Sequence, residues 1–178
     1  MVSPKRMGTF WLSPTPDQVS LGWDAGYKRT ATWGEFTVLA TKQKFFYLNT
    51  HVDNTGNLAR VQSIALIKEK IKELNPYGFP VIVTGDFNAG LEHAMFEPFN
   101  EWLYDARSTS PITDTRATYH GFGKYSTKID HIFYTGLTPL EYETINKTYE
   151  GVTYISDHYP IAALFELKGS ANPDDPQA

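Results

Sequence analysis

The sequence contains no cysteine in its 178 residues. Disulfide frameworks, thiolate metal sites and cysteine nucleophiles are therefore excluded. Any metal ion that this chain binds must be held by oxygen ligands and imidazole nitrogens.

Long hydrophobic runs are also missing. The chain has no apolar stretch of about 18 residues, which excludes a membrane-spanning helix, and residues 1–8 lack the apolar segment of a signal peptide. These absences predict a soluble protein with the cytoplasm as its default location. The location stays unknown if an export signal lies upstream.

The chain has no excess of positive charge, because 16 Lys and Arg residues face 20 Asp and Glu residues, for a net charge of -4. Proteins that follow a nucleic-acid backbone use many basic side chains to neutralise its phosphates. The composition therefore favours a small anionic substrate, and nucleic acid is the less favoured partner.

What is present is enough apolar material for one domain, with 41% hydrophobic and 15% aromatic residues. Residues 1–168 are predicted to form that domain. Residues 169–178 are rich in Gly, Ser, Asn, Pro and Asp and are predicted to be a disordered tail.

Hydrophobic periodicity predicts a mixture of helix and strand. Apolar residues three or four positions apart predict an amphipathic helix over residues 58–74. Residues 10–33 are predicted to be an ordered loop, and residues 92–103 a short helix that Pro98 limits. Runs of apolar and β-branched residues predict strands at 35–40 and 45–50, which form a hairpin, and at 80–84, 129–134 and 160–167.

Polar residues stand at the ends of four predicted strands. Strand ends in a layered sheet protein converge on one rim, so we expect these side chains to share a site. Asp86 and Asn88 would point the same way if the backbone stays extended, although an Asx-turn is an equal alternative for this pair. The residues concerned are His51, Asp86, Asn88, Asp130, Asp157 and His158.

The segments that carry these residues resemble, in order and spacing, the motifs of the endonuclease/exonuclease/phosphatase (DNase I-like) superfamily. Residues 8–13 and 23–33 further resemble a bacterial branch of hydrolases and nucleases within it. The resemblance implies an α/β fold, the DNase I-like four-layer α/β sandwich, in which two sheets pack face to face. The segments are Asn49-Thr50-His51-Val52-Asp53, Gly85-Asp86-Phe87-Asn88-Ala89, Lys128-Ile129-Asp130-His131-Ile132-Phe133 and Ser156-Asp157-His158.

The resemblance also implies catalytic roles. His51 would contact the scissile phosphate, and Asp86 would orient or activate the attacking water. His158 would be the general base or the imidazole that stabilises the transition state. Asp130 would accept a hydrogen bond from an active-site imidazole and so fix its tautomer.

Substrate and metal ligands follow from the same resemblance. Asn88 would hold the water and the phosphoryl oxygens, Asn49 would bind substrate, and Arg29 is the first-ranked cation for the phosphate. Asp157, together with Asp86, would reach a divalent cation. Hard oxygen ligands favour Mg²⁺, with Mn²⁺ as the alternative.

The chain departs from the family pattern at its start. Members carry an earlier segment whose Glu is the principal metal ligand, and no Glu here stands in a matching context. The sequence is therefore expected to begin about halfway through the family domain. Half of a face-to-face sandwich would expose an apolar sheet face, so a homo-oligomer or a missing N-terminal segment is predicted to cover it.

The leading functional prediction is divalent-metal-dependent hydrolysis of a small phosphoester. The enzyme alternative is a nuclease that cleaves phosphodiesters. The non-enzyme alternative is a half-domain without catalytic competence, or a binding module, which the missing Glu favours.

Overall fold

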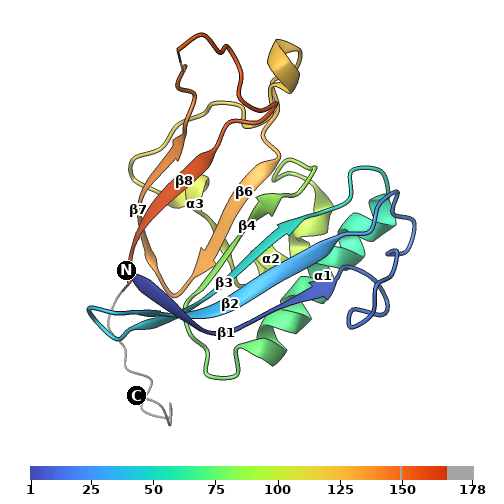
Figure 1. The fold of residues 1–178 in the computed structure, drawn as a ribbon, viewed down its shortest axis with the longest axis vertical. Helices are drawn as coiled ribbons and strands as arrows, with labels where there is room; N and C mark the ends of the chain where they lie inside the picture. The colour runs from blue at the N-terminus through green and yellow to red at the C-terminus, as the bar shows by residue number, and fades with distance from the viewer. Residues whose placement is uncertain (149, 168–178) are drawn as a thin grey trace.

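Figure 1 shows the computed structural model, which describes residues 1–148 and 150–167. A six-stranded mixed sheet has the order β1-β2-β3-β4-β6-β5, and β7 and β8 form a second, two-stranded sheet. The predicted tail, residues 169–178, lies outside the described residues. The strands are β1 (Val2–Trp11), β2 (Thr30–Val38), β3 (Lys44–His51), β4 (Val81–Asp86), β5 (Tyr104–Asp105), β6 (Asp130–Thr135), β7 (Thr138–Thr144) and β8 (Ile161–Glu166).

The helices are short except for one. They are α1 (Asn57–Leu74), η1 (Ala94–Phe96), α2 (Glu97–Asn100), α3 (Ala106–Thr109) and η2 (Gly121–Gly123). In the large sheet only β3 and β4 pair in parallel, and α1 connects them. A parallel pair needs such a crossover, since a tight turn cannot join two strands that run the same way.

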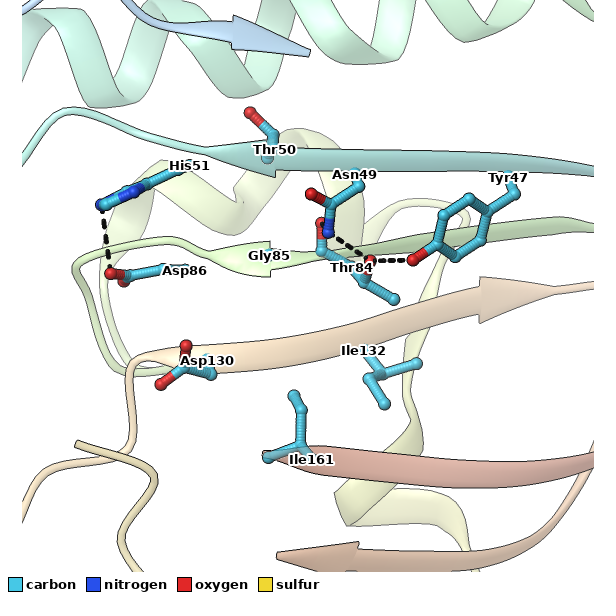
Figure 2. Close-up of a pocket in the computed structure, with 10 residues that line it drawn as sticks. All are labelled: Tyr47, Asn49, Thr50, His51, Thr84, Gly85, Asp86, Asp130, Ile132 and Ile161. Carbon is cyan, nitrogen blue, oxygen red and sulfur yellow. Dashed lines mark hydrogen bonds and ion pairs between the residues drawn. The ribbon is translucent and has the colours of Figure 1, made fainter. Parts of the chain in front are cut away.

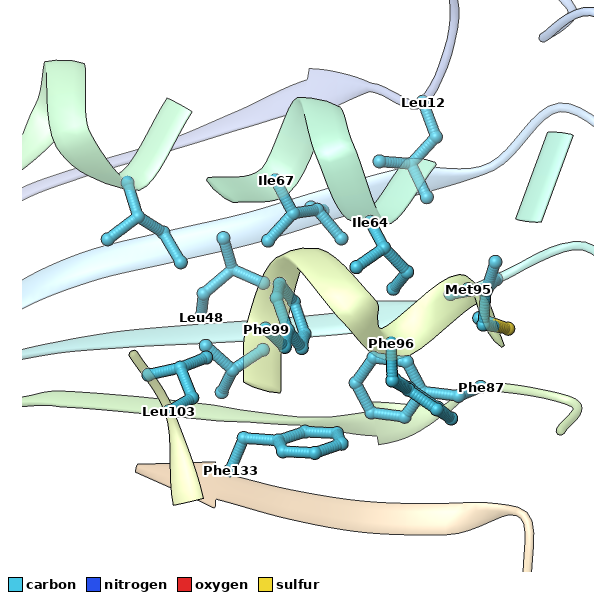
Figure 3. Packing of buried hydrophobic residues seen from close by; sticks show 14 of the residues in the cluster. Leu12, Leu48, Ile64, Ile67, Phe87, Met95, Phe96, Phe99, Leu103 and Phe133 are labelled. Carbon is cyan, nitrogen blue, oxygen red and sulfur yellow. The ribbon is translucent and has the colours of Figure 1, made fainter. Parts of the chain in front are cut away.

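One face of the large sheet is covered by α1 and α2 (Figure 1). Ile64, Ile67 and Ile71 recur at helical spacing on α1 and are buried, as the periodicity predicts. They pack with a group of phenylalanines from the 87–99 segment and from β6 (Figure 3). The sequence from Phe87 to Phe99 thus closes the core beneath the strands that carry the site.

Two aspartates hold the long connection, residues 12–29, against this core. Asp53 is 1% exposed and accepts the N–H groups of Gly26, Tyr27, Thr55 and Gly56. Asp24 accepts the N–H groups of two residues in the first turn of α1. Because these N–H groups have no partner within the helix, Asp24 supplies the N-terminal cap of α1 from a distant loop.

The second sheet has a smaller core. Tyr142 of β7 is buried with Ala106, Ile132 and Tyr134, and Phe165 of β8 packs on Tyr134 with a ring-centroid distance of 4.9 Å. Residues along β8 alternate between partly buried and exposed, and none of its six is fully buried. This sheet therefore borders the large sheet at β6 with one half-covered face.

The predicted helix, the hairpin, the short helix and the three single strands are confirmed within a few residues. The loop predicted at residues 10–33 is wrong at both ends, because β1 extends to Trp11 and β2 begins at Thr30. The strands β1 and β7 were not predicted. Both contain proline and charged residues, which suit sheet edges and weaken the apolar signal of a strand.

Candidate active site

Strand pairing places three of the predicted site residues side by side. His51 at the end of β3 pairs with Asp86 at the end of β4, and Asp86 pairs with Asp130 at the start of β6. Directly paired residues on neighbouring strands extend their side chains to the same face. His51, Asp86 and Asp130 therefore form a row across one edge of the sheet (Figure 2).

His158, in the connection before β8, completes the cluster. Its Nδ1 lies 2.8 Å from Oδ2 of Asp130, and its Nε2 lies 3.8 Å from Oδ2 of Asp86. A carboxylate only accepts hydrogen bonds, so the Nδ1 atom of His158 carries a proton and the Nε2 atom faces Asp86. This is the geometry expected of Asp130 as the acceptor that fixes the tautomer of an imidazole.

Asp86 lies between two imidazoles. The Nε2 atom of His51 is 3.2 Å from the same Oδ2 that faces His158. Burial alone would raise the pKa of Asp86, but the hydrogen bond from His51, the N–H of Asn88 and the charges of His51 and His158 together lower it below 3.8. The carboxylate is consequently ionised at neutral pH and is available to accept a proton or to hold a cation.

Asn88 lies in the Asx-turn that was the equal alternative to an extended backbone. Its φ of 50° is left-handed, so the backbone after Asp86 is not extended. The N–H of Asn88 donates to Oδ1 of Asp86 at 2.8 Å, which is the Asx-turn, and its Nδ2 donates to the carbonyl of Val52 at 2.9 Å. The turn ties β4 to the end of β3 and leaves the amide oxygen of Asn88 as its remaining acceptor.

The buried side chain of His131 bonds to the residue that follows Asn88 in this turn. Its Nε2 lies 2.8 Å from the carbonyl of Ala89 and must carry the proton, since a carbonyl only accepts. Burial lowers the pKa of His131, and hydrogen bonding to Ala89 offsets this only in part. No role was predicted for His131, although it lies in one of the quoted motifs. In the structure its neutral imidazole holds the loop that carries Asn88.

Two further residues that the sequence analysis missed hold Asp130 and His158. The hydroxyl oxygen of Thr118 accepts the N–H groups of Ile129 and Asp130, both at 3.1 Å. The ring of Tyr119 contacts that of His158 with a centroid distance of 4.8 Å. Neither residue lies in a predicted strand, so no local pattern indicated a role for them.

The cluster opens into a pocket of about 440 Å³ that runs along the sheet from His51 and Asp86 toward Tyr47 (Figure 2). Asn49 lines it and donates to the hydroxyl of Thr84 at 2.8 Å, and the hydroxyl of Tyr47 lies 2.7 Å from the same atom. Ile132 and Ile161 line the pocket as apolar residues. The pocket therefore combines hydroxyl and amide groups with apolar side chains, beside the row of His51, Asp86 and Asp130.

Two residues predicted to bind substrate or metal, Arg29 and Asp157, make other contacts in the structure. Arg29 is engaged by Asp53 at 3.7 Å and packs over the ring of Tyr27, and it is not among the residues that line the pocket. Asp157 accepts the N–H groups of His120 and Gly121 through its backbone carbonyl, both at 3.0 Å. Their roles in substrate and metal binding stay predictions.

A possible metal-binding group is present at the same edge. Ligand atoms of Asp86, Asp130 and His158 all lie within 4.8 Å of one another. Two carboxylates and one imidazole fit a divalent cation of the Mg²⁺ or Mn²⁺ kind, which prefers oxygen ligands. Among the residues that the structure describes, Asp157 does not belong to this group.

The mixed sheets match the DNase I-like α/β fold, and one edge of the large sheet gathers two carboxylates and two imidazoles beside a pocket. The chain belongs to the endonuclease/exonuclease/phosphatase family, whose model matches residues 8–158. Members of this family are hydrolases that act on phosphoesters, and they generally use divalent metals. Within the described residues, no helix is long and apolar enough to cross a membrane.

Solved structures of bacterial members have the same fold. The Bacteroides thetaiotaomicron mannosyl-6-phosphatase is 34% identical and superposes with a TM-score of 0.87 over 93% of this chain and 67% of its own. A family protein from Bacteroides vulgatus is 36% identical, with a TM-score of 0.86 over 94% of this chain and 67% of its own.

A viral relative is more distant. An uncharacterised protein of Acanthamoeba polyphaga mimivirus is 29% identical in an alignment that covers 88% of this chain and 63% of that protein. The chain thus spans about two thirds of the length of the relatives it matches.

Proposed function

We propose that this chain provides the catalytic edge of a divalent-metal-dependent phosphoesterase that acts on a small phosphorylated molecule. The observation that carries the proposal is the row of His51, Asp86 and Asp130 on three neighbouring strands, with His158 bonded to Asp130 at 2.8 Å. A mannosyl-6-phosphatase at 34% identity supports a sugar phosphate as the substrate class.

The residues divide the chemistry between them. The Nε2 of His51 lies 3.2 Å from Oδ2 of Asp86 and would turn to a phosphoryl oxygen when substrate binds. Asp86, ionised at neutral pH, would accept a proton from the attacking water. Asp130 keeps the Nδ1 proton of His158 in place, so the Nε2 atom would face the reacting phosphate as base or as donor.

Asp86 and Asp130 would hold the divalent cation through carboxylate oxygens, beside the ring of His158, and Asp157 is a further predicted ligand. When bound, such a cation neutralises negative charge on the phosphoryl oxygens. Asn49 and the amide oxygen of Asn88 would contact substrate or water. A second copy of the chain, in a homo-oligomer, would cover the open sheet face.

Hydrolysis, measured as phosphate release from the monoester and as p-nitrophenol release from the diester, tests the proposal. Mannose 6-phosphate and a generic phosphodiester, bis(p-nitrophenyl) phosphate, would be incubated with the chain in Mg²⁺, in Mn²⁺ and in EDTA. We expect metal-dependent hydrolysis with a preference for the monoester. His158→Ala should lower kcat at least about a hundredfold, because general acid–base groups contribute roughly 10²–10⁴.

The matched control is His93→Asn, which removes an imidazole outside the cluster. It keeps an acceptor for the N–H of Met95, which bonds to the ring of His93 in the native protein. Equal losses in both variants would contradict the proposed role of His158. A folded wild-type chain that hydrolyses neither substrate would support the binding-module alternative, and a preference for the diester would support the nuclease.

A further inference from the structure

An aromatic loop stands beside the proposed active site. It comprises residues 119–125, contains η2, and projects beyond the start of β6 (Figure 1). Phe122 is 60% exposed and Tyr125 is 58% exposed. Two large aromatic side chains in water are not explained by the stability of the core, which makes this loop a candidate contact surface.

The loop is bonded to the segment that carries His158. Tyr119 forms an antiparallel bridge with His158, and the N–H groups of His120 and Gly121 both donate to the carbonyl of Asp157 at 3.0 Å. The ring of Tyr119 lies 4.8 Å from that of His158. A substrate whose phosphate reaches His158 would therefore have its alcohol portion within the neighbourhood of this loop.

The loop is also held in one shape. His120 is buried and its ring packs between those of Tyr154, at 4.5 Å, and Tyr159, at 4.2 Å. Phe122 has a φ of 57° between two glycines that also have positive φ. Left-handed backbone at an aromatic residue is unfavourable, and such strain is typical of positions that function requires.

Tyr125 extends the aromatic surface outward from the site. Its ring stacks on that of Tyr119 with a centroid distance of 5.3 Å and an interplanar angle of 18°. The sequence from His158 through Tyr119 to Tyr125 is thus a continuous series of ring contacts whose outer member is exposed. The electron-rich face of a tyrosine attracts weakly positive hydrogens, such as the axial C–H groups of a sugar ring.

The pocket on the other side of the cluster offers the complementary chemistry. Asn49, Thr84 and Tyr47 present amide and hydroxyl groups that can bond to sugar hydroxyls. A sugar has polar edges and apolar faces, so both kinds of surface around the cluster are compatible with a sugar phosphate. The net charge of -4 argues against a nucleic-acid backbone as the occupant of the loop.

We propose that the stacked pair Tyr119 and Tyr125 binds the ring of a phosphorylated sugar whose phosphate lies at His51, Asp86 and His158. This inference rests on the proposed function and names its substrate class and a specificity-determining surface. Tyr125 contributes to substrate affinity, and Tyr119 both stacks and positions His158.

The test compares substrates with and without a ring. Kinetics with mannose 6-phosphate and with glycerol 3-phosphate would be measured for the wild type, Tyr125→Ala and Tyr125→Phe. We expect Tyr125→Ala to lower kcat/KM for mannose 6-phosphate about tenfold, mainly through KM, and to leave glycerol 3-phosphate unchanged. Tyr125→Phe keeps the ring and should retain the wild-type values.

Tyr104→Ala is the matched control. Tyr104 is 60% exposed and packs on a second tyrosine, Tyr134, with a centroid distance of 5.9 Å, at the far end of β6 from Asp130. Binding of mannose 6-phosphate and of adenosine 5′-monophosphate in EDTA would be measured by calorimetry for the same variants. We expect Tyr125→Ala alone to weaken sugar-phosphate binding, by about tenfold.

The outcomes separate this inference from the proposed function. Hydrolysis of both substrates with no effect of Tyr125→Ala on either would overturn the stacking site and leave the hydrolase proposal standing. Binding of mannose 6-phosphate that depends on Tyr125, without hydrolysis in any metal, would support the stacking site and overturn hydrolysis. Tighter, Tyr125-dependent binding of adenosine 5′-monophosphate would overturn the sugar in favour of a nucleotide, and equal losses in Tyr104→Ala would overturn the site.

Discussion

The two sheets of this protein differ in how firmly their residues are held. β3, β4 and β6 pack against α1 and α2 through side chains such as Phe46, Val83 and Phe133, all almost fully buried. β8 has no fully buried residue, and its contact with β6 depends on the Phe165 and Tyr134 rings. The proposed site draws on both, because His51, Asp86 and Asp130 lie on the firm sheet and His158 precedes β8.

This difference separates two kinds of positioning. The row on the large sheet is fixed by strand register, which a change at the surface cannot move without breaking the sheet. His158 is fixed by side-chain contacts with Asp130 and Tyr119 and by the backbone bonds of its loop. Loosening the second sheet should therefore displace His158 before it disturbs Asp86.

The largest expected loss of stability comes from a substitution in the core of the large sheet. Phe133→Ala should lower the free energy of unfolding by about 3–5 kcal/mol, because Phe133 is 1% exposed and packs against three other aromatic side chains. Phe165→Ala, at a half-covered position, should cost clearly less than the Phe133 change. Urea denaturation of both variants measures the two values, and equal costs would remove the distinction between the sheets.

An intermediate loss of stability is expected when Asp53 is replaced. Burial alone would raise the pKa of Asp53, but four backbone N–H groups lower it below 3.8. The folded-state pKa is therefore below the unfolded one, so its stabilisation is complete above pH 3.8 and is lost as the pH falls through the lower value. Asp53→Asn should cost about 2–3 kcal/mol at pH 7 and flatten the loss of stability as the pH falls below about 4.

Asp53 is compared with Asp114, which lies beside the second sheet. Asp114 accepts the N–H of Thr144 on β7 at 2.6 Å, and burial, which raises its pKa, is outweighed by this and neighbouring hydrogen bonds, which lower it. Asp114 is less buried than Asp53. Thermal unfolding across this pH range should show a smaller change for Asp114→Asn, and an Asp114 variant that loses more stability than the Asp53 variant would contradict the ranking.

Much of the large sheet could be predicted from sequence because its signals are local. The spacing of Ile64, Ile67 and Ile71 is helical by itself, and the short apolar run at residues 81–83 is typical of a buried strand. The convergence of His51, Asp86 and Asp130 followed from the rule that strand ends meet at one edge. The sequence could not show the register that pairs them.

The parts that escaped prediction depend on distant partners. Asp24 caps a helix whose N–H groups lie 34 and 35 residues further along the chain. The Asx-turn at Asn88 was one of two open alternatives, but the bond from its side-chain Nδ2 to the carbonyl of Val52, 36 residues earlier, is a contact that periodicity cannot reveal. Thr118 and Tyr119 support Asp130 and His158 from a loop with no repeating pattern, so only the folded arrangement identifies them.

The smallest effect is expected on the exposed side of β8. Leu164 is 56% exposed, so Leu164→Ser should change the free energy of unfolding by only about 0.5 kcal/mol or less, whereas Leu48→Ser, at a fully buried position of β3, should cost several times more.

Sedimentation of the same samples at micromolar concentration tests the predicted homo-oligomer. If β8 contributes to a contact between copies, Leu164→Ser weakens the association while the fold keeps its stability. A monomeric wild type would instead leave the open face without a second copy of the chain to cover it.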